Sequence, residues 1–432
     1  MEKILLAEGK VGKTEIKLYG EEKIHQYADD LLSKFEFKTK YISDILSCYL
    51  WDGVEVYLFL DENEYNQYVS EHYKESDQEP YKKATFDEES IVILCDEEKL
   101  KNKPFHYANV FAHILVHMIF QYKPTFRDNR VLWYEEGLAQ LLSGEKNLLE
   151  DEEEFKDFML RKVFSEEWKI PSIEYLCEHG NEFGKFDSDD YNSYSISYML
   201  GRYLRDHNAR FYNHFLENVY SIVPYYYYQK NDKDILARAY RFYGVLLGVP
   251  GYDFPFDSIR TPEDLFDYME LYITHGWIDI NGKSHEHSLE GIRDIYRINS
   301  LEQILKSGLG TCIEQTLLEH FVLDNLGIEN KILVDYSPES NSSDNVKLHV
   351  FCAYKLKNYS GYYYFEHANK KRKGIHVYWD FNSLCEEYLR DRNTTRILTE
   401  IPDIPVGYSL NEFIEYVNSF KNIGEGEKRP RR

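Results

Sequence analysis

Two histidines, His113 and His117, stand four positions apart in the apolar segment NVFAHILVHMIFQY. Residues at this spacing lie on one face of a helix, so both imidazoles can reach a single ion. Imidazole nitrogens at this spacing can hold zinc. A second segment, WYEEGLAQLLSG, carries Glu135 and Glu136 and has the hydrophobic spacing of a helix. The histidine pair is therefore a candidate zinc site.

These two predicted helices resemble the core of the gluzincin metallopeptidases, which carry HExxH on one helix and a zinc-binding Glu on the next. The segment WYEEGLAQLLSG is similar to the family's W-x-x-E-G-x-A pattern, which implies that Glu136 joins His113 and His117 as a zinc ligand. The family's general base is the Glu after the first His, but Ile114 stands here and cannot accept a proton. The resemblance thus implies a degenerate site that binds zinc weakly or not at all and does not cleave peptides.

A thiol and a histidine in the second half of the chain could form a different kind of site. Cys312 follows a Gly-Leu-Gly-Thr turn and falls in the first turn of a predicted helix. A helix N-terminus stabilises a thiolate, and its exposed N–H groups can bind an oxyanion. His349 lies on a predicted strand, and the next predicted strand carries Glu366 and His367. Antiparallel pairing would bring Glu366 beside His349, with His349 facing Cys312, as in an activated thiol.

This order resembles the transglutaminase-like, papain-related superfamily, in which a G-x-C helix start is followed by a His strand and then an Asp strand. The resemblance covers about residues 255–390 and is carried by GTC, LHVF and YYFEHA. It implies that Cys312 attacks an acyl carbon, His349 moves the proton and Glu366 orients His349. No cofactor is required for such a site.

The chain departs from this superfamily at the third residue. The family usually has Asp followed by Pro, whereas Glu366 is followed by His367 here. The longer reach of Glu leaves His367 and Asp380 as substitutes. The family also has a Trp or Gln upstream, near the oxyanion, and Trp277 is the candidate for that role.

Composition and charge narrow the classes of partner. The chain has 432 residues and a formal net charge of −24, and such a surface repels nucleic acid and anionic membrane. The N-terminal apolar run is too short for a signal peptide, and no apolar run is long enough to cross a membrane. The six cysteines lack the spacing of a disulfide framework, so we expect a cytoplasmic protein. The sequence carries no signal for an oligomeric state.

Hydrophobic periodicity predicts the elements that must position these residues. Before the histidine helix we expect helix 22–50, strand 53–61, helix 63–73 and strand 90–95. After the Cys312 helix, within residues 300–328, we expect strands at 330–336, 346–356 and 361–368.

A segment with two prolines and a glycine, VPGYDFPFDSIR, leads into a helix start at Thr261 and marks a domain boundary. We predict an α+β protein with a mostly helical gluzincin-like domain that contains a small sheet (1–248). A transglutaminase-like α+β domain with an antiparallel sheet (249–421) and a polar, disordered tail (422–432) would follow.

Three functions are consistent with these residues. The first is a thiol enzyme that acts on protein or peptide amides by Cys-His-Glu acyl transfer, as hydrolysis, deamidation or cross-linking, with the N-terminal domain as a pseudo-metallopeptidase module for binding or regulation. The second is a non-enzymatic protein-binding scaffold built from two degenerate domains. The third is a zinc metallopeptidase with an atypical base, for which Glu135 is the candidate.

Overall fold

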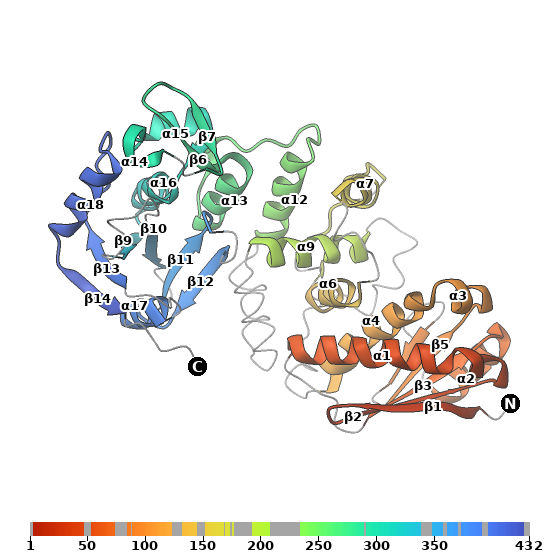
Figure 1. Ribbon diagram of the computed structural model, residues 1–432. Helices are drawn as coiled ribbons and strands as arrows, with labels where there is room; N and C mark the ends of the chain where they lie inside the picture. The colour runs from red at the N-terminus through yellow and green to blue at the C-terminus, as the bar shows by residue number, and fades with distance from the viewer. Residues whose placement is uncertain are drawn as a thin grey trace. The chain divides into compact units, whose positions relative to one another are not determined.

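The computed structural model shows a chain of mixed helices and strands (Figure 1). The chain divides into two compact units, with the main boundary between Gly251 and Tyr252, close to the predicted boundary after Gly248. The residues that the structure describes are 3–46, 53–73, 84–87, 89–122, 132–144, 152–167, 169–172, 175–176, 192–207, 234–288, 291–337, 348–356, 361–369, 373–390 and 396–426.

The first unit contains a five-stranded mixed sheet with the order β1-β2-β3-β5-β4. Strands β2, β3 and β5 are parallel, and the outer strands β1 and β4 pair antiparallel with their neighbours. The strands are β1 (Ile4–Val11), β2 (Thr14–Gly20), β3 (Val54–Phe59), β4 (Ala84–Phe86) and β5 (Ser90–Leu94). Strands β3 and β5 were predicted. The β1–β2 hairpin was not predicted, although buried and more exposed residues alternate along β2 as in a strand with one buried face.

Helices surround this sheet. Helix α1 packs against β1 and α4, and α4 packs against α6, so α4 is buried along most of its length. The helices are α1 (His25–Leu46), α2 (Glu62–His72), α3 (Glu97–Asn102), α4 (Pro104–Tyr122), α6 (Leu132–Ser143), α7 (Glu152–Lys162), α9 (Ser193–His207) and α12 (Ile235–Leu246).

A close approach of two helices fixes the position of α6. A Cβ atom at Gly137 would lie 2.5 Å from the carbonyl oxygen of Ser197 on α9, and a Cβ atom at Gly201 would lie 3.2 Å from Gly137. Only glycine allows backbones to approach this closely. Glu136 directly precedes Gly137, so this contact also fixes the position of the Glu136 backbone, from which the carboxylate extends.

The second unit contains a six-stranded sheet with the order β12-β11-β10-β9-β13-β14, in which every described pairing is antiparallel. The antiparallel sheet predicted for this half is therefore present. The strands are β9 (Glu329–Tyr336), β10 (Leu348–Lys355), β11 (Tyr362–Glu366), β12 (Gly374–Tyr378), β13 (Arg396–Ile401) and β14 (Asn422–Gly426).

Hydrophobic side chains alternate between the two faces of this sheet, as the pleat requires. One face, with Val334 and Val350, packs on helices α16 (Cys312–Asn325) and α18 (Leu410–Asn418). The opposite face, with Leu333 and Phe351, packs on α17 (Phe381–Arg390). The sheet is therefore a middle layer between helices (Figure 1).

A small three-stranded sheet, β7-β6-β8, lies next to the start of α16. Strand β6 (Thr274–Ile278) follows α13 (Pro262–Tyr272), which begins with the predicted cap at Thr261. Strand β7 (Ser284–Glu286) completes a hairpin with β6. Helix α15 (Leu301–Ser307) leads into strand β8 (Leu309–Gly310), which pairs with β6 immediately before Cys312.

The prediction of a disordered tail from Asn422 is wrong for its first residues. Residues 422–426 form strand β14, which pairs with β13 at the edge of the sheet. The pairing uses backbone hydrogen bonds, which a polar edge strand can make without a hydrophobic pattern. The rest of the predicted tail, 427–432, lies outside the described residues.

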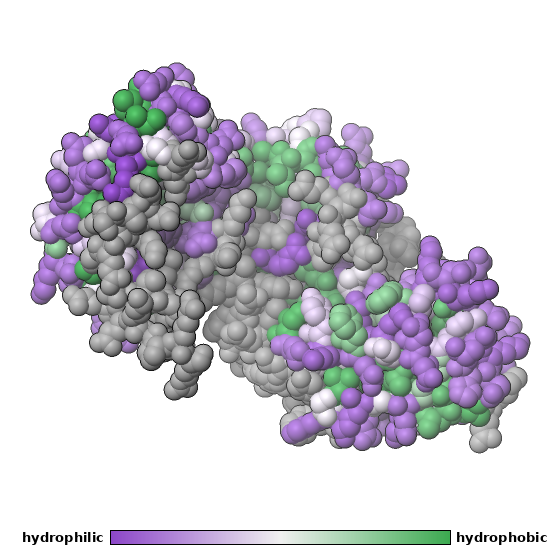
Figure 2. Space-filling model, in the orientation of Figure 1, coloured by the Kyte–Doolittle hydropathy of each residue, from purple (hydrophilic) through white to green (hydrophobic). Residues whose placement is uncertain are grey.

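Figure 2 shows that hydrophilic residues predominate among the coloured residues on the visible face of each unit, with smaller hydrophobic areas among them. Among the described residues, no helix has the length and hydropathy needed to cross a membrane.

Candidate functional site

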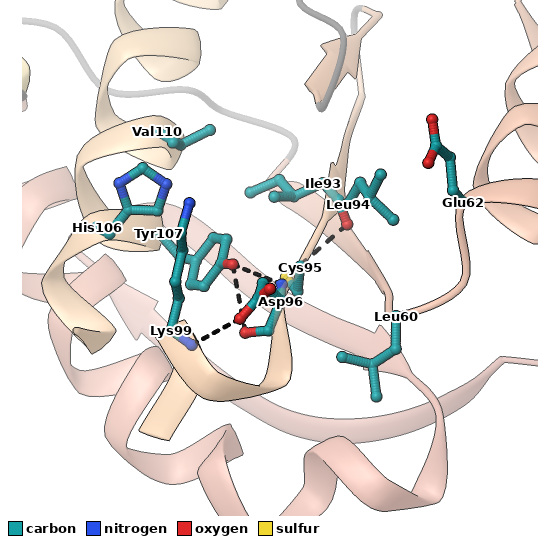
Figure 3. Close-up of a pocket in the computed structure, with 10 residues that line it drawn as sticks. All are labelled: Leu60, Glu62, Ile93, Leu94, Cys95, Asp96, Lys99, His106, Tyr107 and Val110. Carbon is teal, nitrogen blue, oxygen red and sulfur yellow. Dashed lines mark hydrogen bonds between the residues drawn. The ribbon is translucent and has the colours of Figure 1, made fainter. Parts of the chain in front are cut away.

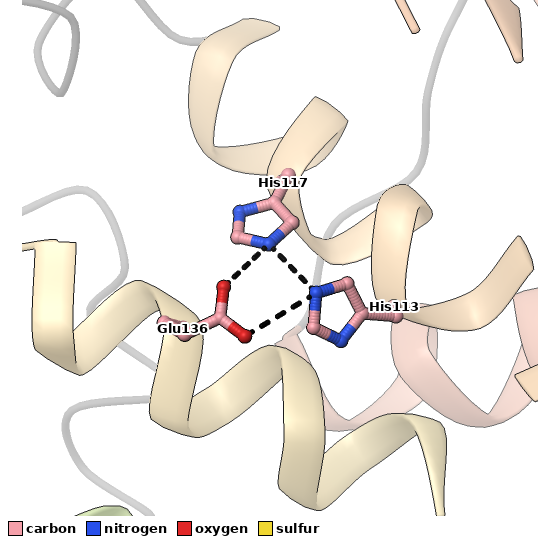
Figure 4. A group of neighbouring side chains, drawn as sticks. All are labelled: His113, His117 and Glu136. Carbon is pink, nitrogen blue, oxygen red and sulfur yellow. Dashed lines mark hydrogen bonds and ion pairs between the residues drawn. The ribbon is translucent and has the colours of Figure 1, made fainter. Parts of the chain in front are cut away.

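Three buried side chains of the first unit converge between helices α4 and α6 (Figure 4). His113 Nε2 lies 3.1 Å from His117 Nε2. The two carboxylate oxygens of Glu136 lie 3.4 Å from His113 Nε2 and 3.2 Å from His117 Nε2. The structure therefore brings together the three predicted ligands, and the group could hold a metal ion.

Neighbouring side chains orient these groups. The carboxylate of Glu135 lies 2.7 Å from His117 Nδ1, and Gln140 Nε2 donates to Glu136 at 3.0 Å. Burial lowers the pKa of His117, but hydrogen bonds with Glu135 and Glu136 outweigh burial and raise it to about 10. Burial raises the pKa of Glu136, but the charges and hydrogen bonds of His113 and His117 hold it well below its usual value.

A pocket of about 190 Å³ lies at the carboxyl ends of β3 and β5. Figure 3 shows Lys99 and His106 on one side of it and Glu62 on the other. The pocket residues His106 and Val110 share a helical stripe of α4 with His113, because these positions are separated by four and three residues. The pocket is thus one turn of α4 away from the histidine group.

Cys312, His349 and Glu366 are brought together in the second unit. Cys312 is the first residue of α16, and its thiol interacts with the imidazole of His349 near the start of β10 and raises the pKa of that imidazole. His349 Nε2 lies 2.8 Å from Glu366 Oε2, at the end of β11. The structure therefore brings the three predicted residues together, with His349 interacting with both the thiol and the carboxylate.

Electrostatics favour an ionised His349–Glu366 pair. Burial lowers the pKa of His349, but the charge of Glu366 and hydrogen bonds to Cys312 and Glu366 raise it to about 10. Burial raises the pKa of Glu366, but His349 holds it below its usual value. Glu366 is 2% exposed and also accepts the backbone N–H of Asn369 at 2.9 Å. The carboxylate is thus fixed in position as well as charged.

The start of α16 is held by a buried network. Glu314 accepts the hydroxyl of Tyr296 at 2.7 Å and the backbone N–H groups of Asn299 and Thr311 at 3.1 and 2.9 Å. Thr311 caps the helix with its side chain. These contacts satisfy a fully buried carboxyl, and they fix the backbone that carries Cys312.

The two alternatives to Glu366 lie elsewhere. Both ring nitrogens of His367 are engaged, by Glu270 at 2.5 Å and by the carbonyl oxygen of Ile273 at 2.7 Å. Asp380 accepts the backbone N–H of Ser383 at 2.7 Å at the start of α17. Of the three acidic or imidazole groups considered from sequence, Glu366 is therefore the partner of His349.

Trp277 is not positioned to bind an oxyanion, which was its predicted role. Its indole is fully buried, stacks on His285 and donates its N–H to the carbonyl oxygen of Ser288 at 2.8 Å. Because an indole has one N–H donor, that donor is already used. Trp277 instead packs in the core beside Tyr296.

Two residues near this site were not found from sequence. Glu319 lies about two turns after Cys312 on the same helix, and burial and the charge of Glu366 raise its pKa well above the usual value. His275 lies on β6, opposite Gly310 of β8. The two-turn spacing of Glu319 was visible in the sequence, whereas the pairing of the two-residue strand β8 has no sequence signal.

No protein-family model matches this chain, and no curated protein matches it either.

Proposed function

We propose that the protein is a transglutaminase-like thiol enzyme that acts on protein or peptide amides through Cys312, His349 and Glu366. The observation that carries the proposal is the grouping of the Cys312 thiol at a helix start with His349, whose Nε2 lies 2.8 Å from the buried Glu366 carboxylate. The resemblance of GTC, LHVF and YYFEHA to the superfamily supports it. The first unit would then serve as a gluzincin-like module for binding or regulation.

The arrangement suits acyl transfer. Cys312 Sγ attacks the carbonyl carbon of an amide, and the C–N bond breaks as His349 gives its proton to the leaving amine. A thioester on Cys312 remains. Water or a second amine then attacks the carbonyl carbon of this thioester, and His349 takes the proton of the attacking group. The C–S bond breaks, and the Cys312 thiolate leaves with its electron pair. Glu366 stays ionised throughout and holds the imidazole in the required orientation.

Exchanging Glu366 for Gln tests the role of this carboxylate. Glu366→Gln should slow alkylation of Cys312 by iodoacetamide about tenfold near pH 7.5, because loss of an opposite charge lowers the pKa of His349 by roughly one to three units. His367→Ala should change the rate less than about twofold, since His367 bonds to Glu270 and Ile273 instead.

The rates are measured by mass spectrometry of the Cys312 peptide, after thermal denaturation has shown that both variants are folded. A normal rate in Glu366→Gln together with a lost rate in His367→Ala would reverse the assignment and remove Glu366 from the site.

We propose that the histidine group of the first unit binds zinc. Tetrahedral zinc with bond lengths of about 2.0–2.1 Å places its ligand atoms about 3.3 Å apart. The Nε2 atoms of His113 and His117 are 3.1 Å apart, close to this spacing, and each lies within 3.4 Å of a different oxygen of the Glu136 carboxylate. Glu135 and Gln140 supply the outer hydrogen bonds that usually orient zinc ligands.

Peptidase activity at this group is not part of the proposal. Ile114 stands at the position of the family's general base, and its hydrocarbon side chain is buried. Glu135, the alternative base, is 1% exposed and is held against His117 Nδ1, the nitrogen that faces away from His113 and Glu136. A carboxylate in that position orients a ligand rather than activating water.

The cysteines suit a reducing compartment, so the proposal places the protein in the cytoplasm. All four described cysteines, Cys95, Cys312, Cys352 and Cys385, are free. The two others, Cys48 and Cys177, lie outside the described residues.

A further inference from the structure

The pairing of β6 with β8 brings a histidine to the start of the Cys312 helix. His275 pairs in parallel with Gly310, two residues before Cys312, and the backbone N–H of Thr274 donates to Gly308 at 2.7 Å. Paired residues of parallel strands direct their side chains to the same face of the sheet. A Cβ atom at Gly310 would point at Glu314 and Gln315 in the first turn of α16. His275 therefore faces that turn.

The neighbours of β6 support this orientation. Trp277 is two residues further along the same strand and must share the face of His275. Trp277 packs in the hydrophobic core that includes Ile313 and that Cys312 packs against. The charges of His349 and Glu366 also act on the pKa of His275.

The imidazole of His275 is neutral near pH 7 and can still donate a hydrogen bond. Burial lowers its pKa, and the charges of His287, His367 and His349 lower it further, while Glu366 opposes them. A neutral imidazole keeps one N–H. The side chain of His275 is only partly buried. The only N–H donor of Trp277, by contrast, is hydrogen-bonded to the carbonyl oxygen of Ser288.

We propose that His275 is a catalytic residue that donates a hydrogen bond to the carbonyl oxygen of the acyl group attacked by Cys312. This inference rests on the proposed thiol chemistry. When Sγ bonds to the carbonyl carbon, the C=O electron pair moves onto oxygen, and this oxyanion is where an N–H donor lowers the barrier.

Two electrophiles distinguish a donor to the oxyanion from a residue that only makes the thiol more reactive. p-Nitrophenyl acetate reacts through a tetrahedral oxyanion: Sγ bonds to the acetyl carbon, p-nitrophenolate leaves with the electron pair of the broken C–O bond, and acetyl-Cys312 remains. Iodoacetamide reacts at a saturated carbon, where Sγ displaces iodide and no oxyanion forms. A donor to the oxyanion affects the first reaction alone.

We expect His275→Ala to slow acetylation of Cys312 about 10²-fold, as loss of one oxyanion donor typically does. Alkylation by iodoacetamide should stay within about twofold of the wild type. His275→Gln keeps a side-chain N–H and should restore part of the acetylation rate. His285→Ala is the matched control, because His285 lies on the same hairpin but bonds to Asp279 at 3.1 Å. It should leave both rates unchanged.

Equal losses in both reactions, or no loss of acetylation, would overturn the role of His275 while leaving the thiol enzyme standing. A wild-type Cys312 that reacts with neither reagent faster than Cys385 would overturn the thiol enzyme itself, and the role of His275 with it. Thermal denaturation of His275→Ala and His275→Gln identifies a variant that fails to fold, and a folded His275→Gln still decides the question.

Discussion

Replacing His349 by Ala is expected to slow acetylation of Cys312 by p-nitrophenyl acetate about 10²–10⁴-fold near pH 7, the usual effect of losing a positioned acid–base group. His349 interacts with the Cys312 thiol and lies 2.8 Å from Glu366, so its removal deprives the thiolate of its cationic partner and separates it from the carboxylate. The rate is followed as released p-nitrophenolate, with Cys312→Ser as the blank.

His320→Ala is the control for this variant. His320 lies on the same helix as Cys312 but contacts Asn330 and Asp324 instead of the thiol. It should acetylate at the wild-type rate. An unchanged rate in His349→Ala, with Cys312→Ser inactive, would mean that the thiol reacts without this imidazole.

The interaction of His349 with Glu366 should also make the stability of the folded protein depend on pH. The folded-state pKa of His349 is raised to about 10, so its partners stabilise the folded state fully below the unfolded pKa of about 6.5. This contribution is lost as the pH rises from there through about 10. The stability difference between wild type and His349→Ala should therefore shrink over that range.

Replacing Glu136 by Gln should weaken zinc binding by more than the roughly 10- to 100-fold that loss of an outer hydrogen-bond partner costs. Glu136 supplies both oxygens that face the imidazoles, and the amide of Gln carries no charge. The affinity is measured by competition with a chromophoric chelator. Glu97→Gln, which changes an exposed acid on α3, is the control and should bind zinc as the wild type does.

The zinc-loaded wild type should show no chelator-sensitive peptidase activity, because Ile114 replaces the base. Equal zinc affinity in wild type and Glu136→Gln would show that the ion binds elsewhere. Proteolysis that is lost with chelator and in Glu136→Gln would show that the site has another base.

Short motifs predicted the central residues because their geometry is local. The four-residue spacing of His113 and His117 fixes a shared helix face, and the Gly-Thr-Cys sequence places Cys312 at a helix start. The contact of His349 with Glu366 followed from strand order alone. These features depend on neighbouring residues or on simple antiparallel pairing.

The features that were missed depend on long-range pairing. Trp277 was chosen for its residue type, but its donor is consumed by Ser288, a contact that folding creates. His275 gains its position from β8, a strand of only two residues with no hydrophobic pattern. Strand β14 likewise exists through backbone bonds to β13, so its polar sequence resembled a disordered tail.

The most direct test of the thiol site is the order in which the cysteines react. Burial raises the pKa of Cys95 and Cys352 far above the usual value and that of Cys385 to about 11, so roughly 1 in 3,000 Cys385 side chains is thiolate at pH 7.5. Cys312 is less buried and contacts His349.

The measurement is a time course of iodoacetamide labelling of the folded protein at pH 7.5, read for each cysteine by mass spectrometry, with a urea-unfolded sample as the reference. The thiol-site account predicts that Cys312 is labelled before every other cysteine and that this order disappears in urea. Labelling of Cys352 or Cys385 ahead of Cys312 in the folded protein would contradict it.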